Sequence, residues 1–376
     1  MSASPREGSG HERRAALVPR IYVFVIALFL LSAIIYNPRD TLTGVAIAAH
    51  RHSSPSLDRQ GATKMSRYGV KSAYGNLLQV IMHRPGPELD VVTERTLREF
   101  HFARPVHREK FMSEYDAMLG LFQSHGVETL LLRDILTGDG DSLAYIDHRP
   151  NLMYTRDLAV VFSRGAVLMR PHLKGRWGDQ EMMGRAFRRL GVPVLGAIEP
   201  PGYLEGGGVT LIGEDTAVAS LCDRANESGT RALRDLILGK DVKYFLEVPL
   251  PFGHIHIDGI FMVLDESLCL IHEDSFRVFP CRLYEAGSSA PRHVMFEEFL
   301  HQRGFRFIPI TEKERRGGHL NVVVTRQSRT AIGFQHALRV ASEMERLGWQ
   351  LATFPSEELF MGNGGAHCMT CPLLMD

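Results

Sequence analysis

The feature that most constrains the fold is a local pattern that returns four times in the sequence. In each copy, two short runs rich in β-branched residues flank a tight polar turn, and a helical stretch follows. Two apolar runs joined by a few turn residues predict a β-hairpin. The predicted hairpins span residues 159–169, 209–219, 260–271 and 321–332.

Helices are predicted between the hairpins, because apolar residues recur there at a spacing of three to four. The predicted helices span 113–124, 179–190, 225–238, 295–303 and 335–347. A fifth hairpin can be assembled from residues 77–83 and residues 368–374, which lie at the two ends of the repeat-containing region. Repeated units that cannot bury their apolar faces alone predict a radial array, and pairing of the last strand with the first would close it. The predicted fold is therefore α/β, with hairpin–helix units around a central site.

Composition argues against nucleic-acid binding and for a reducing location. The chain has 376 residues, and 43 basic residues balance 43 acidic ones, so the formal net charge is zero. A nucleic-acid-binding protein would normally carry a basic excess, and none is expected as a partner. Five cysteines form no disulfide framework in a chain of this length, which favours a reducing, cytoplasmic location for the catalytic domain.

The first 64 residues differ from the rest. Basic residues precede the apolar run 21–36, and a polar linker follows it. As a helix this run reaches about 24 Å, short of the roughly 30 Å hydrocarbon layer. A signal peptide, a single membrane anchor and a working start at Met65 all stay open. We therefore predict an extension over 1–64, which would be the membrane tether if there is one, and a catalytic domain over 65–376.

The strongest chemical signal lies near the end of the chain. The segment Gly364-Gly-Ala-His-Cys368 presents one cysteine in a glycine-rich loop. Glycines let the backbone approach a ligand closely, whereas most lone cysteines are inert filler of a core. The loop therefore favours a nucleophilic Cys368. Cys371 begins the predicted closing strand, and we assign it a structural role.

Earlier segments place polar groups directly before or within predicted strands. Asp157 precedes one strand, and Glu205 stands before three glycines that lead into another. In His254-Ile-His-Ile-Asp258, strand alternation would place His254, His256 and Asp258 on one face. Such a face must be solvated, paired or liganded. A histidine acting as general acid and base is favoured, and a metal site built on these three residues is the rival.

These motifs in this order resemble the arginine deiminase and amidinotransferase superfamily, the guanidino-modifying enzymes called penteins. The likeness spans roughly residues 75–376. It rests on 150–157, Glu205-Gly-Gly, 221–226, His256-x-Asp258 and 364–370. The resemblance implies a five-bladed, pseudo-symmetric α/β propeller. It also implies a small guanidino substrate and no metal or other cofactor.

The resemblance implies roles for particular residues. Cys368 would be the nucleophile and His256 the general acid and base. Glu205 would orient that histidine or help to bind the substrate guanidinium. Asp157 and Asp258 would hold the guanidinium nitrogens.

Further positions would recognise the rest of the substrate. Asn151 and Arg224 would face its α-carboxylate, and Arg176 is a second candidate for that contact. The family's Glu-Gly-Gly segment commonly continues with aspartate, but here the position is Gly208. This departure leaves the identity of the substrate open.

The predicted function is cysteine-dependent hydrolysis of a guanidino substrate, with arginine to citrulline plus ammonia as first choice. Transfer of the amidino group to an amine is the alternative within the same chemistry. A catalytically silent pentein acting as a binding module is an alternative from another class. A homo-oligomer is compatible with the sequence.

Overall fold

A computed structural model describes residues 68–325 and 329–376. The apolar run 21–36 and the predicted boundary near residue 64 lie outside these ranges, so the extension stays a prediction. The described residues form an α/β fold with five sheets, four of three strands and one of five. Within these ranges, no helix combines the length and apolar character needed to span a membrane.

Each sheet is built on the same unit, which the first predicted hairpin illustrates. Strand β3 (Ala159–Phe162) pairs antiparallel with β4 (Gly165–Leu168). Helix α5 (Asp179–Leu190) follows, and β5 (Val194–Ala197) returns parallel to β4. A helix is the usual way to connect parallel strands, which need a long crossover.

The other three predicted hairpins are confirmed as units of the same kind. The second unit comprises β6 (Val209–Ile212), β7 (Thr216–Leu221), α6 (Glu227–Ile237) and β8 (Tyr244–Pro249). The third comprises β9 (Phe261–Asp265), β10 (Leu268–Ile271), α7 (Phe296–Gln302) and β13 (Arg306–Pro309). The fourth comprises β14 (Val323–Val324), β15 (Thr330–Phe334), α9 (Leu338–Arg346) and β16 (Gln350–Phe354). An additional hairpin, β11 (Cys281–Glu285) and β12 (Arg292–Val294), extends the second sheet at β8.

The two ends of the described region form the fifth unit, as the sequence predicts. Strand β1 (Leu77–Met82) pairs antiparallel with β17 (Cys371–Met375). After α2 (Arg108–Ser124), strand β2 (Glu128–Leu131) runs parallel to β1 on its other side. Both edges of β1 are therefore covered. Four short helices complete the set: α1 (Leu97–Phe100), α3 (Leu132–Ile135), α4 (Gly140–Ile146) and α8 (Glu312–Arg316).

Local signals account for the ends of the helices. Helix α5 ends where Gly191 adopts a φ of 71°, a left-handed conformation that glycine accepts without strain. Helix α6 begins after Asn226, whose side chain accepts a hydrogen bond from the backbone N–H of Gly229. Helix α2 begins earlier than predicted, because the ring of His107 caps its first turn.

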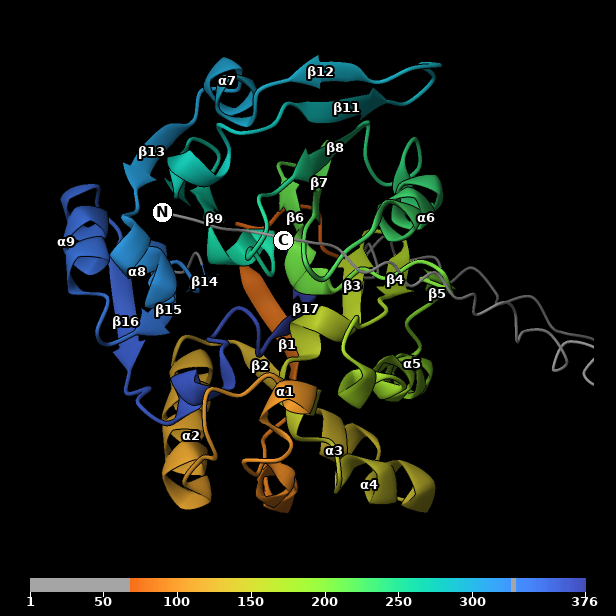
Figure 1. Cartoon of the computed structure of the whole chain (residues 1–376), viewed down its shortest axis with the longest axis vertical. Helices are drawn as coiled ribbons and strands as arrows, with labels where there is room; N and C mark the ends of the chain where they lie inside the picture. Colours follow the sequence, from red (N-terminus) through yellow and green to blue (C-terminus); the bar gives the residue numbers. More distant parts are fainter. Residues whose placement is uncertain (1–67, 326–328) are drawn as a thin grey trace, which may run out of the picture. The chain divides into compact units, whose positions relative to one another are not determined.

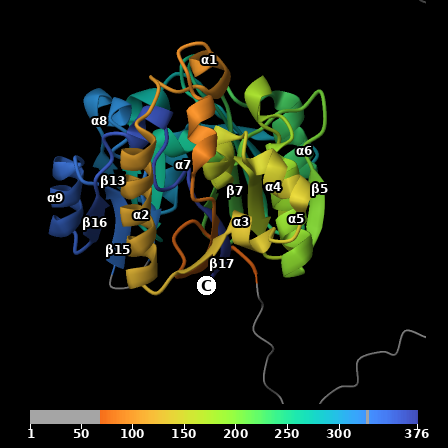
Figure 2. The same cartoon turned by 90° about the horizontal axis from the view of Figure 1, so that it is seen from below.

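One cavity is lined by the first strand of each of the five units. These strands are β3, β6, β9, β14 and β17. They lie around the middle of the view, with α2, α5, α6 and α9 outside them (Figure 1). In the second view, α9 and α5 lie on opposite flanks (Figure 2). One residue from each strand illustrates the lining: Val160, Leu211, Met262, Val323 and Cys371. Because these strands converge, the segments that lead into them also meet, and they carry the candidate site.

Candidate active site

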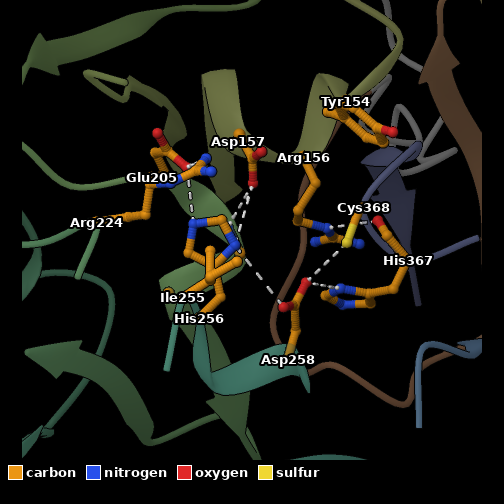
Figure 3. Close-up of polar contacts among 12 residues, drawn as sticks. Tyr154, Arg156, Asp157, Glu205, Arg224, Ile255, His256, Asp258, His367 and Cys368 are labelled. Carbon is orange, nitrogen blue, oxygen red and sulfur yellow. Dashed lines mark hydrogen bonds and ion pairs between the residues drawn. The ribbon is translucent and has the colours of Figure 1, made fainter. Parts of the chain in front are cut away.

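Five polar side chains enter the site from equivalent positions in the five units. Each belongs to the short segment that leads into the first strand of its unit. Three of these segments are the turns of 3-10 helix at Thr155–Leu158, Gly206–Gly208 and Ile257–Gly259. The five residues are Asp157, Glu205, Asp258, Asn321 and Cys368. Figure 3 shows four of them around His256.

Cys368 is nearly buried, with 8% of its surface exposed. The side-chain amide of Asn321 donates a hydrogen bond to the sulfur at 2.9 Å, and the thiol donates to Asp258 Oδ2 at 3.6 Å. Burial, followed by the carboxylates of Asp258 and Asp157, raises the pKa of the thiol well above its ordinary value. These surroundings therefore favour the neutral thiol of Cys368 over the thiolate.

His256 is surrounded by three carboxylates. Its Nε2 lies 2.8 Å from Glu205 Oε2, and its Nδ1 lies 3.8 Å from Asp157 Oδ1 and 3.9 Å from Asp258 Oδ1. Burial by itself lowers the pKa of His256, but the three carboxylates outweigh it and the net shift is upward. The imidazole therefore tends to hold a proton.

Two arginines balance this acidic centre. Arg224 donates to Glu205 Oε2 at 3.0 Å, and Arg176 donates to Asp157 Oδ2 at 2.7 Å. Burial alone would raise the pKa of Glu205, but Arg224 and the hydrogen bond with His256 hold it well below its ordinary value. Both arginines thus contact carboxylates of the site, and their predicted contact with a substrate carboxylate stays a prediction.

Asn151 borders the same pocket as Asp157, Arg224 and Cys368. Its amide nitrogen donates to the carbonyl oxygen of Phe100 at 3.0 Å. Its side-chain oxygen is buried and has no hydrogen-bond partner among the described residues. The predicted role of Asn151 in substrate binding is compatible with this position and stays a prediction.

The prediction that His254, His256 and Asp258 share one strand face is wrong. Residues 254–256 form no strand, and Asp258 lies in a turn of 3-10 helix before β9. His254 Nε2 lies 2.8 Å from the hydroxyl of Ser275, whereas His256 contacts Glu205. Of the three predicted metal ligands, His256 and Asp258 therefore lie 3.9 Å apart, whereas His254 pairs with Ser275, because strand alternation does not apply to this turn.

The described residues do contain one group with the spacing of metal ligands. Ligand atoms of Asp157, Glu205 and His256 lie within 4.8 Å of one another. However, Arg176 and Arg224 already form ion pairs with the two carboxylates. The arrangement therefore needs no metal to balance its charge.

Sequence reasoning missed two residues that hold the cysteine loop. Asn321 Oδ1 accepts a hydrogen bond from the backbone N–H of His367 at 2.9 Å. The ring Nδ1 of His367 donates to Asp258 Oδ2 at 2.8 Å. Asn321 could have been found by aligning the predicted units, because it precedes its strand as Asp157 precedes β3. We see no comparable signal for His367 beyond its place next to Cys368.

Two glycines after Glu205 face different surroundings. A Cβ atom at Gly207 would lie 2.6 Å from His256 Nδ1 and 3.0 Å from Asp157 Oδ1. A Cβ atom at Gly208 would instead lie 3.1 Å from the hydroxyl of Ser220. Gly207 is therefore required for the close approach of His256, while a side chain at position 208 would start toward Ser220.

We expect Gly207→Ala to lower kcat about 10²-fold, since a displacement of His256 by roughly 1 Å is enough for such a loss. Gly120→Ala adds the same methyl group in α2, where a Cβ atom meets nothing within 4 Å, and it should keep wild-type activity. Steady-state kinetics with circular dichroism as a check on folding would test this. Full activity of Gly207→Ala would contradict the assigned packing.

Comparisons with known proteins point to one family. The profile of the family described as arginine deiminase matches residues 137–374. The arginine deiminase of Mycolicibacterium gilvum is 21% identical over 400 residues, covering 81% of this chain and 97% of that protein. The arginine deiminase of Rhodococcus jostii is 20% identical, covering 82% of this chain and 97% of that protein.

Solved structures share the fold. DDAH from Pseudomonas aeruginosa, solved in complex with citrulline, superposes with a TM-score of 0.60 at 20% identity, covering 78% of this chain and 98% of that one. The N-terminal domain of ArgZ, a cyanobacterial arginine dihydrolase, gives a TM-score of 0.61 at 12% identity, covering 79% and 98%.

The family profile and the sequence relatives, together with the shared fold, identify the chain as a pentein of the guanidino-modifying superfamily. Within that superfamily, the chain belongs to the arginine deiminase family, whose profile covers more than half of it.

Proposed function

We propose that this chain is a cysteine-dependent hydrolase of a guanidino substrate, with arginine to citrulline plus ammonia as the first candidate reaction. The observation that carries the proposal is that two buried carboxylates, Asp157 and Asp258, lie beside His256 and Cys368, which border two adjoining pockets. Two carboxylates suit a planar cation, and a thiol beside them suits attack on its carbon. We further propose that the five sheets act as the blades of a pseudo-symmetric propeller, with the reacting residues at its centre.

Substrate binding would itself activate the nucleophile. A guanidinium held by Asp157 and Asp258 brings a positive charge next to the sulfur, which lies 3.6 Å from Asp258 Oδ2. This charge offsets the carboxylates that raise the pKa of the thiol. The thiolate would therefore form mainly when the correct cation is bound, and the amide of Asn321 would stabilise it.

The reaction would then proceed in two halves. The Cys368 thiol loses its proton to solvent, its sulfur adds to the guanidinium carbon, His256 gives its proton to the departing nitrogen, and the carbon–nitrogen bond breaks to release ammonia. A covalent thiouronium intermediate remains. Neutral His256 next removes one proton from water, whose oxygen attacks the same carbon. The carbon–sulfur bond then breaks and the remaining hydroxyl proton passes to the sulfur, which releases citrulline and restores the thiol.

The rest of the substrate would bind in the pocket that Asp157 borders. Asn151, Arg176 and Arg224 lie there. We propose that Arg224, and Asn151 through the second N–H of its side-chain amide, donate hydrogen bonds to the α-carboxylate of the substrate. Arg224 would then be shared between Glu205 and the ligand, and Arg176 would mainly hold Asp157.

We expect Glu205→Gln to move the high-pH limb of the kcat/KM profile toward lower pH, by about one unit. Glu205 raises the pKa of His256, so its neutralisation lets the imidazole lose its proton at lower pH. Because protonated His256 serves the leaving nitrogen, activity would then fall earlier as pH rises. A pH–rate profile measures this.

The matched control is Glu128→Gln, which removes an exposed carboxylate that pairs with Gln79. Circular dichroism would verify that both variants fold. If the high-pH limb of the Glu205→Gln profile coincides with that of the wild type, His256 is not the general acid.

A further inference from the structure

Two pockets border the reacting residues His256 and Cys368. The inner pocket contains Asn151, Asp157, Arg176 and Arg224. The outer pocket contains Asp258, Asn321, Phe334, Phe360, Arg315 and Arg316. The outer pocket is the larger of the two. The reacting centre therefore opens onto a second, larger space.

The two pockets lie on different sides of the guanidinium position. Asp157 borders only the inner pocket, and Asp258 borders only the outer one. A guanidinium held between these carboxylates has one nitrogen directed to each side. If its amino-acid chain occupies the inner pocket, the nitrogen near Asp258 faces the outer pocket.

The part of the outer pocket that α8 lines carries excess positive charge. Arg315 donates to both oxygens of Glu312, at 2.5 and 2.8 Å, and Arg316 donates to the same carboxylate through its Nε at 2.6 Å. One carboxylate thus pairs with two guanidinium groups, so one positive charge is left over. The side chain of Arg316 is 75% exposed, and its terminal nitrogens have no acceptor among the described residues.

Other titratable groups at the outer pocket do not cancel this charge. His101 and His254 line it as well, and burial and Arg224 lower the pKa of His101 to about 4, so that it is neutral. Asp258 is the single carboxylate among the lining residues, and it lies at the reacting end beside Cys368 and His367. The arginine wall can therefore accept an additional anionic group.

We propose that the outer pocket receives an acidic substituent on the second guanidinium nitrogen, so that the preferred substrate is an N,N′-disubstituted guanidine whose leaving amine carries a carboxylate. This inference rests on the proposed function. The amino-acid chain lies in the inner pocket, the guanidinium lies between Asp157 and Asp258, and the carboxylate of the leaving amine lies against Arg315 and Arg316. Phe334 and Phe360 enclose the carbon atoms between them.

The chemistry balances as in the simple hydrolysis. The Cys368 sulfur bonds to the guanidinium carbon, and the bond from that carbon to the substituted nitrogen breaks. His256 supplies the proton, so the leaving group departs as an amino acid instead of ammonia. Water then releases citrulline and regenerates the thiol.

Three probes on the full chain test the inference: arginine, Nω-methylarginine and Nω-carboxymethylarginine. The carboxymethyl compound should yield citrulline and glycine, with a kcat/KM about tenfold above that of the methyl compound. This preference should decrease as salt rises, because an exposed charge contact is screened. Amino-acid analysis separates glycine, methylamine and ammonia as leaving groups.

Variants identify the residues responsible. Arg316→Gln and Arg315→Gln should each lower the carboxymethyl-to-methyl preference about two- to fivefold, the range expected for exposed ion pairs. Arg346→Gln is the matched control, because Arg346 is 72% exposed and pairs with Glu343 on α9. It should leave the preference unchanged. Arg316 is the safer of the two test positions, since its exposed side chain contributes little to folding.

The outcomes separate the inference from the proposed function. Turnover of arginine with no preference for the carboxymethyl compound would overturn the inference and leave the hydrolase proposal standing. A preference that survives in both arginine variants would also overturn it. Failure of all three probes, without a covalent adduct on Cys368, would refute both.

Discussion

Replacement of Cys368 by alanine is expected to reduce turnover of a guanidino substrate by at least about 10⁴-fold, because loss of a nucleophile removes the covalent route. No other cysteine within the described ranges borders either pocket at the reacting centre. Cys269, Cys281 and Cys371 are buried in strands. The fold should survive, because the change removes only a small side chain.

Intact-protein mass spectrometry measures the same prediction directly. Wild type incubated with arginine should gain an amidino-containing adduct, with citrulline and ammonia accumulating, and Cys368→Ala should gain none. Cys281→Ala is the control, and it should keep both the adduct and the activity. An adduct that persists until an amine such as glycine is added would move the assignment to an amidinotransferase. Absence of any adduct with arginine, agmatine and methylated arginines would favour the catalytically silent binding module.

Replacement of Asp258 by asparagine is expected to change catalysis and thiol reactivity in opposite directions. Turnover should fall about 10²- to 10³-fold, the usual loss when a group that stabilises the reacting charge is removed. The thiol should nevertheless become more reactive. Apart from burial, Asp258 is the largest cause of the raised pKa of Cys368, so its neutralisation lowers that pKa and increases the thiolate fraction at a given pH.

The rate of alkylation by iodoacetamide as a function of pH measures the second effect, and steady-state kinetics measures the first. The inflection in alkylation should move to lower pH in Asp258→Asn. Asp116→Asn, which removes a partly exposed partner of Arg84, should alter neither quantity. Slower alkylation combined with unchanged turnover would show that Asp258 does not act on the sulfur or the substrate.

Much of the fold follows from local sequence patterns. Each hairpin–helix unit could be predicted because β-branched runs, polar turns and helical spacing depend only on neighbouring residues. Pairing of β1 with β17 could be predicted as well, since the incomplete unit at each end would otherwise leave an edge uncovered. The placement of Asp157, Glu205 and Cys368 in segments that lead into strands could likewise be predicted from the sequence.

The partners of these side chains were decided by the tertiary structure. The sequence alone does not say that His256 contacts Glu205 while His254 turns to Ser275, because both contacts join segments far apart in the chain. The same holds for Asn321 beside the sulfur of Cys368. Sequence periodicity states which face a residue occupies, but a hydrogen bond or an ion pair depends on where two separate elements come to lie. By itself the sequence therefore determined the repeated units and the residue types that lead into their strands, and only the tertiary packing of those units determined which of these residues come into contact.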